Sequence, residues 1–160
     1  MENKKKIRSF YDLEVYQVAY QAMRDVFESI LPKLPQEEKF DLVDQIRRSS
    51  KAIPRLIAEG HSKRHQKRGF QKYLDDAMAE SNETVVSLTQ AKDLYPSLMD
   101  IGLCEKLIDT YDKVSRQCYN LSLAWDKFGE RKFKTQPYDE QRNEQRNRMT
   151  KDKASLYSSP

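Results

Sequence analysis

The chain has 160 residues, of which 34% are charged and 38% hydrophobic, with four glycines and a net charge of +4. This length allows one domain with a real core, and the composition favours helices over sheet. No apolar run reaches the ~18 residues of a membrane helix, and the first residues lack the hydrophobic centre of a signal peptide, so we expect a cytoplasmic protein without membrane contact.

The first helix is predicted to follow a basic segment, residues 1–9, that we expect to be mobile. Asp12 can cap this helix. Apolar residues at three- and four-residue steps mark its core face: Leu13, Tyr16, Tyr20, Met23, Phe27, Ile30 and Leu31. We interpret the aromatic residues of this stripe as core and not as a stacking platform for bases. Pro32 and Pro35 turn the chain into the next helix.

The second helix contains the stretch that combines most features, residues 45–60. Its core stripe is Ile46, Ser49, Ser50, Ile53 and Ile57. A row of cations recurs every four residues beside it: Arg47, Lys51 and Arg55. Pro54 interrupts the hydrogen bonding, so a kink is expected there. Gly60 follows the last periodic residue and is predicted to form the left-handed cap of the helix.

Two further helices complete the predicted fold. Residues 61–69 are polar and are predicted to form a loop. Apolar residues with a helical period of 3.6 then extend from Phe70 to Tyr95, and Pro96 is predicted to end this helix. The fourth helix extends from Leu103 to Phe128 in steps of four and three. Beyond Gly129 the periodicity fails, so residues 129–160 are predicted to be a disordered tail. The fold class is therefore all-α, an up-down-up-down four-helix bundle over residues 10–128.

The positive charge is concentrated in one zone. Residues 47–72 carry nine basic residues and one acidic residue, while residues 1–9 and 129–160 carry +3 each. The rest of the chain therefore has a net charge of −10. Such segregation favours an anionic polymer as partner over a solvated helix face. The candidate nucleic-acid-binding residues are Arg47, Arg48, Lys51, Arg55, Lys63, Arg64, Lys67, Arg68 and Lys72.

Catalytic and metal-binding patterns are scarce. The sequence lacks a Glu-x-x-His repeat and a phosphate-binding glycine loop, and the two histidines, His61 and His65, are surrounded by cations. The acidic residues Asp76, Glu80 and Glu83 share one side of the third helix, but a solvent face or salt bridges explain them better than Mg²⁺. We therefore predict no catalytic residue, no metal and no cofactor.

One enzymatic alternative stays open. Five residues separate Arg55 from His61, a spacing similar to the Arg-His motif of the HEPN ribonucleases. Leu56 stands where those proteins have a polar residue. Histidine would manage proton transfer around a 2′-hydroxyl and arginine would hold the phosphate. Cys104 and Cys118 are too far apart along one predicted helix to bridge, and we expect reduced thiols.

The runs QIRR at residues 45–48 and IPRLIAEG at residues 53–60 resemble the signature of bacterial four-helix-bundle proteins of the S23 type, first noticed as reading frames in intervening sequences of 23S rRNA genes. Other matching positions are Leu13, Tyr16, Leu34, Pro35, the EKFDL run at residues 38–42, Phe70, Tyr73, Leu74, Ala77 and Glu83. The resemblance covers residues 10–128. This chain departs from it at three places: Tyr16 replaces a tryptophan, Leu56 an asparagine, and Ala79 and Glu80 a glycine-serine pair.

This resemblance implies a fold and a class of function. Members are similar in fold to the accessory variability protein of diversity-generating retroelements, a pentameric basic barrel that works beside a reverse transcriptase and binds nucleic acid. We therefore expect a non-enzymatic scaffold that binds nucleic acid, with RNA favoured, and that serves as an accessory subunit to a reverse transcriptase. A protein-interaction scaffold without nucleic-acid binding is the alternative, and a HEPN-like endoribonuclease is a second.

The sequence also predicts a homo-oligomer, with a cyclic pentamer implied by the resemblance. The first helix carries a second set of apolar residues beside its main stripe: Val15, Val18, Ala19, Ala22 and Val26. The fourth helix adds Ile108 and Leu123 away from its own stripe. We interpret these sets as surfaces for a neighbouring subunit, because a soluble monomer rarely exposes a large apolar patch.

Overall fold

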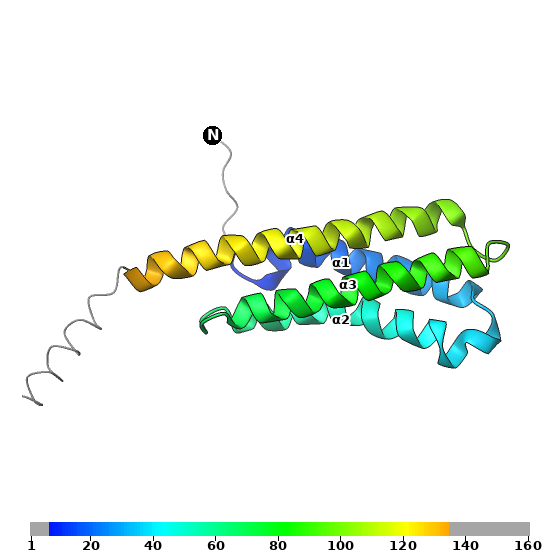
Figure 1. Cartoon of the computed structure of the whole chain (residues 1–160), viewed down its shortest axis with the longest axis horizontal. Coiled ribbons are helices and arrows are strands. Elements are labelled where there is room, and N and C mark those ends of the chain that lie inside the picture. The colour runs from blue at the N-terminus through cyan, green and yellow to red at the C-terminus, as the bar shows by residue number, and fades with distance from the viewer. Residues whose placement is uncertain (1–6, 135–160) are drawn as a thin grey trace, which may run out of the picture. The chain divides into compact units, whose positions relative to one another are not determined.

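The computed structural model describes residues 7–134, and side chains as far as residue 127 (Figure 1). The chain divides into two units, residues 1–126 and residues 127–160, and the helical bundle lies in the first except for the last residues of its fourth helix. Its helices are α1 (Glu14–Asp25), α2 (Leu42–Ser62), α3 (Gly69–Leu94) and α4 (Ile101–Lys134). The all-α class is confirmed. None of the helices in the described residues is long and apolar enough to cross a membrane.

Short helical segments connect these elements. The 3-10 helix η1 (Phe10–Asp12) precedes α1, and α1 continues through a π-helical turn, η2 (Val26–Ile30), into a 3-10 turn, η3 (Leu31–Lys33). A further 3-10 helix, η4 (Gln36–Phe40), leads into α2. The regular α-helix ends at Asp25, and the π-helical and 3-10 turns carry the chain to Pro32 and Pro35, where the predicted turn lies.

Contacts between neighbouring helices show an up-down arrangement. Thr84 of α3 donates a 2.8 Å hydrogen bond to Ser49 of α2 at mid-helix, and Tyr73 of α3 donates to Glu59 near the end of α2. The same inverse order joins α3 and α4, because Gln71 bonds Asp126, Ser81 bonds the Tyr111 carbonyl, and Lys92 lies 3.9 Å from Glu105. Gln117 of α4 bonds Glu14 of α1. The α2–α3 and α3–α4 pairs are therefore antiparallel.

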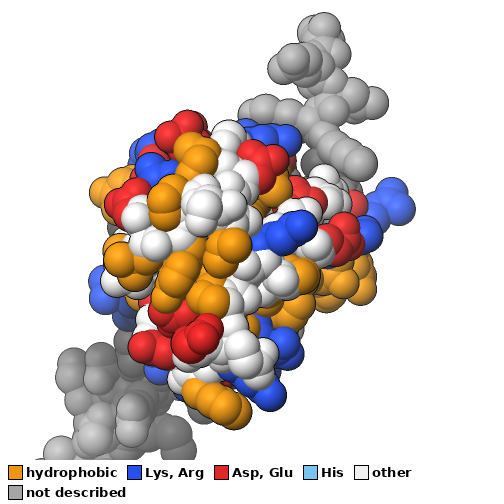
Figure 2. All heavy atoms as spheres, turned by 90° about the vertical axis from the view of Figure 1, so that its right-hand side faces the viewer, with side chains coloured by type: hydrophobic (Ala, Val, Ile, Leu, Met, Phe, Trp, Pro, Cys, Tyr) orange, Lys and Arg blue, Asp and Glu red, His pale blue; other side chains and the backbone are white. Residues whose placement is uncertain are grey.

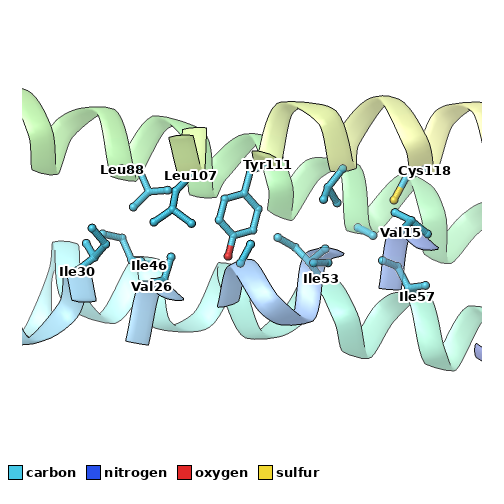
Figure 3. Packing of buried hydrophobic residues seen from close by; sticks show 14 of the residues in the cluster. Val15, Val26, Ile30, Ile46, Ile53, Ile57, Leu88, Leu107, Tyr111 and Cys118 are labelled. Carbon is cyan, nitrogen blue, oxygen red and sulfur yellow. The ribbon is translucent and has the colours of Figure 1, made fainter. Parts of the chain in front are cut away.

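The core is one apolar cluster to which all four helices contribute (Figure 3). Its fully buried large side chains include Tyr111, Phe70, Ile30, Ile46, Ile53, Ile57, Leu74, Leu88, Leu107, Val26 and Val114. Figure 3 shows the Tyr111 ring of α4 reaching across the core toward α1 and α2. Both cysteines are free and buried, and burial raises the pKa of Cys118 to about 12. The predicted reduced thiols fit this environment.

The face of α1 that enters the core differs in part from the predicted one. Leu13, Ile30 and Leu31 of the predicted stripe are buried, whereas Tyr16 is half-exposed and Tyr20 is 45% exposed. Val15, Ala19, Ala22 and Val26, predicted as part of a surface for another subunit, are buried in the core, and Val18 is half-buried. Small side chains allow α1 to approach its neighbours closely, and tyrosine keeps its hydroxyl group in water.

The α2 helix continues through Pro54, which is buried, and the kink expected at this residue stays a prediction. One prediction about α2 needs correction. Gly60 is not a left-handed cap, because no described glycine has a positive φ and α2 continues to Ser62. Instead, a β-carbon on Gly60 would lie 2.6 Å from the β-carbon of Tyr73. Gly60 therefore allows α2 and α3 to pack closely.

The ends of the predicted bundle differ modestly from the structure. Asp12 accepts hydrogen bonds from the backbone N–H groups of Arg8 and Ser9, so it caps η1 and not α1. The α3 helix ends at Leu94, just before Pro96, as predicted. The α4 helix continues past Gly129 to Lys134. The rest of the predicted tail, residues 135–160, and residues 1–6 of the basic N-terminal segment lie outside the described residues.

Apolar side chains are exposed at the end of the bundle where α3 turns into α4. Figure 2 views this end and shows hydrophobic side chains gathered on it. The exposed residues of this region are Phe40, Leu94, Leu98 and Ile101. We call these four residues the apolar end. They lie at the opposite end of α2 and α3 from the connection between these two helices (Figure 1).

Candidate functional site

The nine candidate cations fall into two groups. Four are exposed residues of α2: Arg47, Arg48, Lys51 and Arg55. The other five lie at the connection between α2 and α3: Lys63, Arg64, Lys67, Arg68 and Lys72. We call this second group the basic turn. All nine side chains are exposed except Lys63, which is half-buried.

The α2 group is partly opposed by acidic residues. A groove of about 420 Å³ between α2 and α3 is lined by Gln45, Arg48, Lys51, Ala52, Arg55, Glu80 and Glu83. Burial raises the pKa of Glu80, and the neighbouring Glu83 adds to this effect while Arg48 opposes it. Arg48 also lies 3.6 Å from Asp44. The groove therefore mixes both signs of charge and presents a weaker positive field than its three cations alone would give.

Arg47 lies apart from this groove, on the side of α2 that faces η2, the continuation of α1. Its guanidinium group lies 5.5 Å from the ring centroid of Phe27, a cation–π geometry. The sequence placed Arg47 in one row with Lys51 and Arg55, but the structure directs it to a different neighbour.

The start of the basic turn is held by a small polar network. Lys63 donates to the Tyr73 hydroxyl and, at 3.1 Å, to Glu59, and the Tyr73 hydroxyl donates to Glu59 at 3.0 Å. The hydrogen bond from Lys63, and then that from Tyr73, lowers the pKa of Glu59. The Tyr73 hydroxyl and then Glu59 raise the pKa of Lys63. Glu59 thus orients Lys63.

The backbone of the basic turn is tight. Gln66 donates to the Lys63 carbonyl at 2.9 Å, and Gly69 donates to the Gln66 carbonyl at 3.0 Å. A β-carbon on Gly69 would lie 2.4 Å from the Lys63 carbonyl oxygen, so only glycine fits there. Arg68 has a φ of 57° in the left-handed region. This conformation costs an arginine about 1 kcal/mol and is kept by the turn around it.

Three cations of the basic turn are available for a ligand. Within residues 7–127, Lys67, Arg68 and Lys72 have no carboxylate within salt-bridge distance, and all three are exposed. Arg64 donates to the His61 carbonyl at 2.7 Å, which fixes its side chain against the end of α2. The basic turn is therefore the stronger positive feature of the two groups.

His61, which the ribonuclease alternative requires, is 5% exposed. Its ring meets Phe70 edge-to-face at 5.8 Å, and Phe70 meets Trp125 in the same way at 5.0 Å. Burial, assisted by Arg64, lowers the pKa of His61, and Asp12 opposes this effect. Arg55 lines the groove instead. The two residues of the Arg-His spacing thus lie in different environments.

Both histidines and the acidic side of α3 lie apart from any cluster of metal-binding side chains in the described residues. No group of three or more His, Cys, Asp or Glu residues within the described part of the chain has the geometry to hold a metal ion. Glu80 and Glu83 face the cations of α2 across the groove. They fit the salt-bridging interpretation better than a Mg²⁺ site.

Sequence reasoning missed one surface feature, an aromatic cluster on η1 and α1. Its ring centroids lie 4.2 Å apart for Phe10 and Tyr11, 4.9 Å for Phe10 and Tyr16, 5.6 Å for Tyr11 and Tyr16, and 5.8 Å for Tyr16 and Tyr20. We call these four residues the tyrosine cluster. The tyrosines in the predicted core stripe could have indicated this surface position, because the hydroxyl group of tyrosine favours contact with water.

Comparison with protein families identifies a relationship over most of the bundle. Residues 11–121 match the family described as 23S rRNA-intervening sequence protein. The chain belongs to this family. The matched segment includes α1, α2, α3 and the basic turn. The resemblance noted in the sequence is thus confirmed at the level of the family. Comparisons with curated proteins and with solved structures gave no match.

Proposed function

We propose that this member of the 23S rRNA-intervening sequence protein family is a non-enzymatic scaffold that binds nucleic acid, RNA in preference to a specific duplex DNA site. The observation that carries the proposal is the basic turn, where Lys67, Arg68 and Lys72 are exposed and have no ion-pair partner among the described residues. Exposed cations on a tight backbone suit phosphate groups of any sequence. The cations of α2 extend this surface.

Salt dependence is the first test of this proposal. Each phosphate that the protein neutralises contributes about 0.7 to 0.9 to the slope of log K against log salt concentration. Fluorescence anisotropy with a labelled RNA should therefore show affinity falling steeply as salt rises. A slope near zero would contradict phosphate binding.

A matched pair of charge reversals locates the binding surface. Lys67→Glu, Arg68→Glu and Lys72→Glu in one protein should abolish binding, because none of these side chains has a salt bridge within the described residues that its loss would break. The control carries Lys33→Glu, Lys39→Glu and Lys106→Glu, which are exposed cations near the apolar end. Both variants change the net charge by the same amount. Equal binding by the two variants would locate the interface elsewhere.

The burial of His61 supports a role without catalysis. A histidine that is 5% exposed and packed against Phe70 cannot reach a 2′-hydroxyl group without opening the end of the bundle. Wild type and His61→Ala should both leave a single-stranded RNA intact during incubation in EDTA. Cleavage by the wild type that disappears in His61→Ala would instead support the ribonuclease.

We further propose that the scaffold is a homo-oligomer, with the cyclic pentamer that the resemblance implies. Tyr119 and Leu123 of α4 support it, because they are exposed and lie one turn apart on the same side of the helix. A pentamer of the 18.9 kDa chain has a mass of about 95 kDa in light scattering. Leu123→Glu should lower this mass and weaken RNA binding together, since several basic turns act on one RNA. A wild-type mass of one chain would end the oligomer proposal.

The apolar end favours a second candidate, a protein-interaction scaffold. Phe40 is 86% exposed and Leu94 is 64% exposed at this end (Figure 2), and such surfaces often bind proteins. A reverse transcriptase is the partner that the resemblance implies. A neighbouring reverse transcriptase gene with template and variable repeats would favour this accessory role, and a position inside an rRNA gene would favour the intervening-sequence role.

A further inference from the structure

The tyrosine cluster presents aromatic rings to solvent at the start of α1. Tyr11 is 63% exposed and Tyr20 is 45% exposed, while Phe10 and Tyr16 lie between them and are partly buried against the core. The four rings form a chain in which each contacts the next, and Tyr16 and Tyr20 are stacked with an interplanar angle of 28°. The inner rings thus brace the exposed ones. An exposed ring that is held in place can accept a stacking partner at low entropic cost.

The cluster lies at the same end of the bundle as the basic turn. The 3-10 helix η1, which carries Phe10 and Tyr11, contacts α2. Asp12 of η1 is close enough to His61 to influence its charge, and Arg64 donates to the His61 carbonyl. Figure 1 shows η1 near the end of α2 from which the basic turn begins. Aromatic rings and unpaired cations therefore occur together on this part of the protein.

We propose that the tyrosine cluster is a stacking platform for unpaired bases, and that it binds the same RNA strand whose phosphates contact the basic turn. This inference rests on the proposed function and narrows the ligand to single-stranded RNA. Proteins that bind single strands combine cations along the backbone with aromatic side chains under the bases. Base pairs in a duplex keep their faces stacked on one another and cannot use Tyr11 or Tyr20 in this way.

The positive charge near the tyrosine cluster favours a nucleic acid as its ligand over an apolar protein surface. The side chains of the basic turn attract a polyanion to this end of the bundle, and Arg8 adds a further exposed cation next to η1. A purely apolar partner would gain nothing from these charges. A strand that places phosphates on Lys67 and Arg68 and bases on the tyrosine rings uses both features.

The experiment compares two RNAs and single substitutions in the full chain. The probes are a fluorescein-labelled single-stranded RNA of about 15 nucleotides and a duplex RNA of the same length. Tyr11→Leu and Tyr20→Leu keep an apolar side chain and remove the ring, so each should weaken single-strand binding about tenfold and leave duplex binding unchanged. Tyr11→Phe keeps the ring and should retain wild-type affinity. Phe40→Leu, which changes a still more exposed aromatic residue at the apolar end, is the control and should change neither affinity.

The outcomes separate this inference from the proposed function. If the charge reversals in the basic turn abolish binding but Tyr11→Leu and Tyr20→Leu bind the single strand like wild type, the stacking platform is wrong and the proposed function stands. If wild type binds neither RNA, the proposed function fails and the platform fails with it. If Tyr11→Leu weakens both RNAs equally and lowers the mass in light scattering, the cluster is a contact between copies of the chain and the inference is overturned.

Discussion

Gly60 of α2 lies directly against Tyr73 of α3, since a β-carbon on Gly60 would be 2.6 Å from the Tyr73 β-carbon and 3.0 Å from the Phe70 ring. This contact sets the distance between the two helices at the end that carries the basic turn. Tyr73 also orients Lys63 through its hydroxyl group. Packing and the position of the first cation of the turn are therefore linked.

Gly60→Ala should destabilise the protein by about 1–2 kcal/mol, because the overlap with a backbone-attached carbon outweighs the gain in helix propensity. Gly102→Ala is the matched control on α4, where a new β-carbon would have its nearest contact at 3.6 Å. That variant should gain up to about 0.5–1 kcal/mol. Urea unfolding measures both. A stable Gly60→Ala would contradict the close packing.

Tyr111→Phe should stabilise the protein by about 1 kcal/mol. The Tyr111 hydroxyl is buried and has no hydrogen-bond partner among the described residues, so its removal relieves a desolvation cost. Burial raises the pKa of Tyr111 above its usual value. The unfolded chain therefore loses this proton first, and the advantage of Tyr111→Phe should grow above about pH 10. Urea midpoints at neutral and high pH test this, and a loss of stability would reveal an unseen partner.

Acidification should destabilise the fold through His61. Because burial lowers the pKa of His61, the unfolded chain binds more protons below the ordinary histidine pKa of about 6.5. The contribution of neutral His61 to the free energy of unfolding is therefore fully present above that pH and is lost as the pH falls. Urea midpoints between about pH 7.5 and 5.5 should fall for wild type and fall less for His61→Gln. His65→Gln changes an exposed residue and should behave like wild type; an equal slope in all three proteins would refute this role of His61.

Arg68→Gly should stabilise the protein while it weakens RNA binding. Among the described residues, Arg68 alone is a non-glycine with a positive φ, and glycine adopts this conformation without strain. A net gain of about 0.5–1 kcal/mol is expected after the higher entropy of the unfolded glycine chain. Loss of one phosphate contact should lower the salt slope by about 0.7 to 0.9. Unchanged affinity would remove Arg68 from the interface, and unchanged stability would mean that its backbone is not strained.

Much of the fold could be predicted because the apolar period is strong in each helix. The end of α3 before Pro96 follows from local sequence alone. The face of α1 could not be predicted, because Val15 and Ala19 on one side and Tyr16 and Tyr20 on the other are both spaced correctly for a core. Only the neighbouring helices decide between two apolar stripes, and close packing selected the smaller side chains.

The candidate site was predictable as a set of cations but not as a surface. The four-residue spacing predicted one row of Arg47, Lys51 and Arg55. In the structure Arg47 instead contacts Phe27 of η2, because η2 lies beside this part of α2. Glu80 and Glu83 are distant from the cations in sequence, so their place across the groove required the antiparallel pairing of α2 and α3. The prediction of a helix cap at Gly60 was wrong, because a glycine near a helix end can either cap the helix or allow another helix to pack closely.

The short connection between α2 and α3 also has a consequence for the order of folding. Thr84 and Ser49 meet across a hairpin whose halves are adjacent in the chain, so closing it costs little entropy. We expect this hairpin to form in the transition state, before α1 and α4 dock. Ala77→Gly should then slow folding, whereas Ala19→Gly in α1 should mainly speed unfolding, as stopped-flow kinetics would measure. The cations of the basic turn would thus meet before the rest of the bundle is complete.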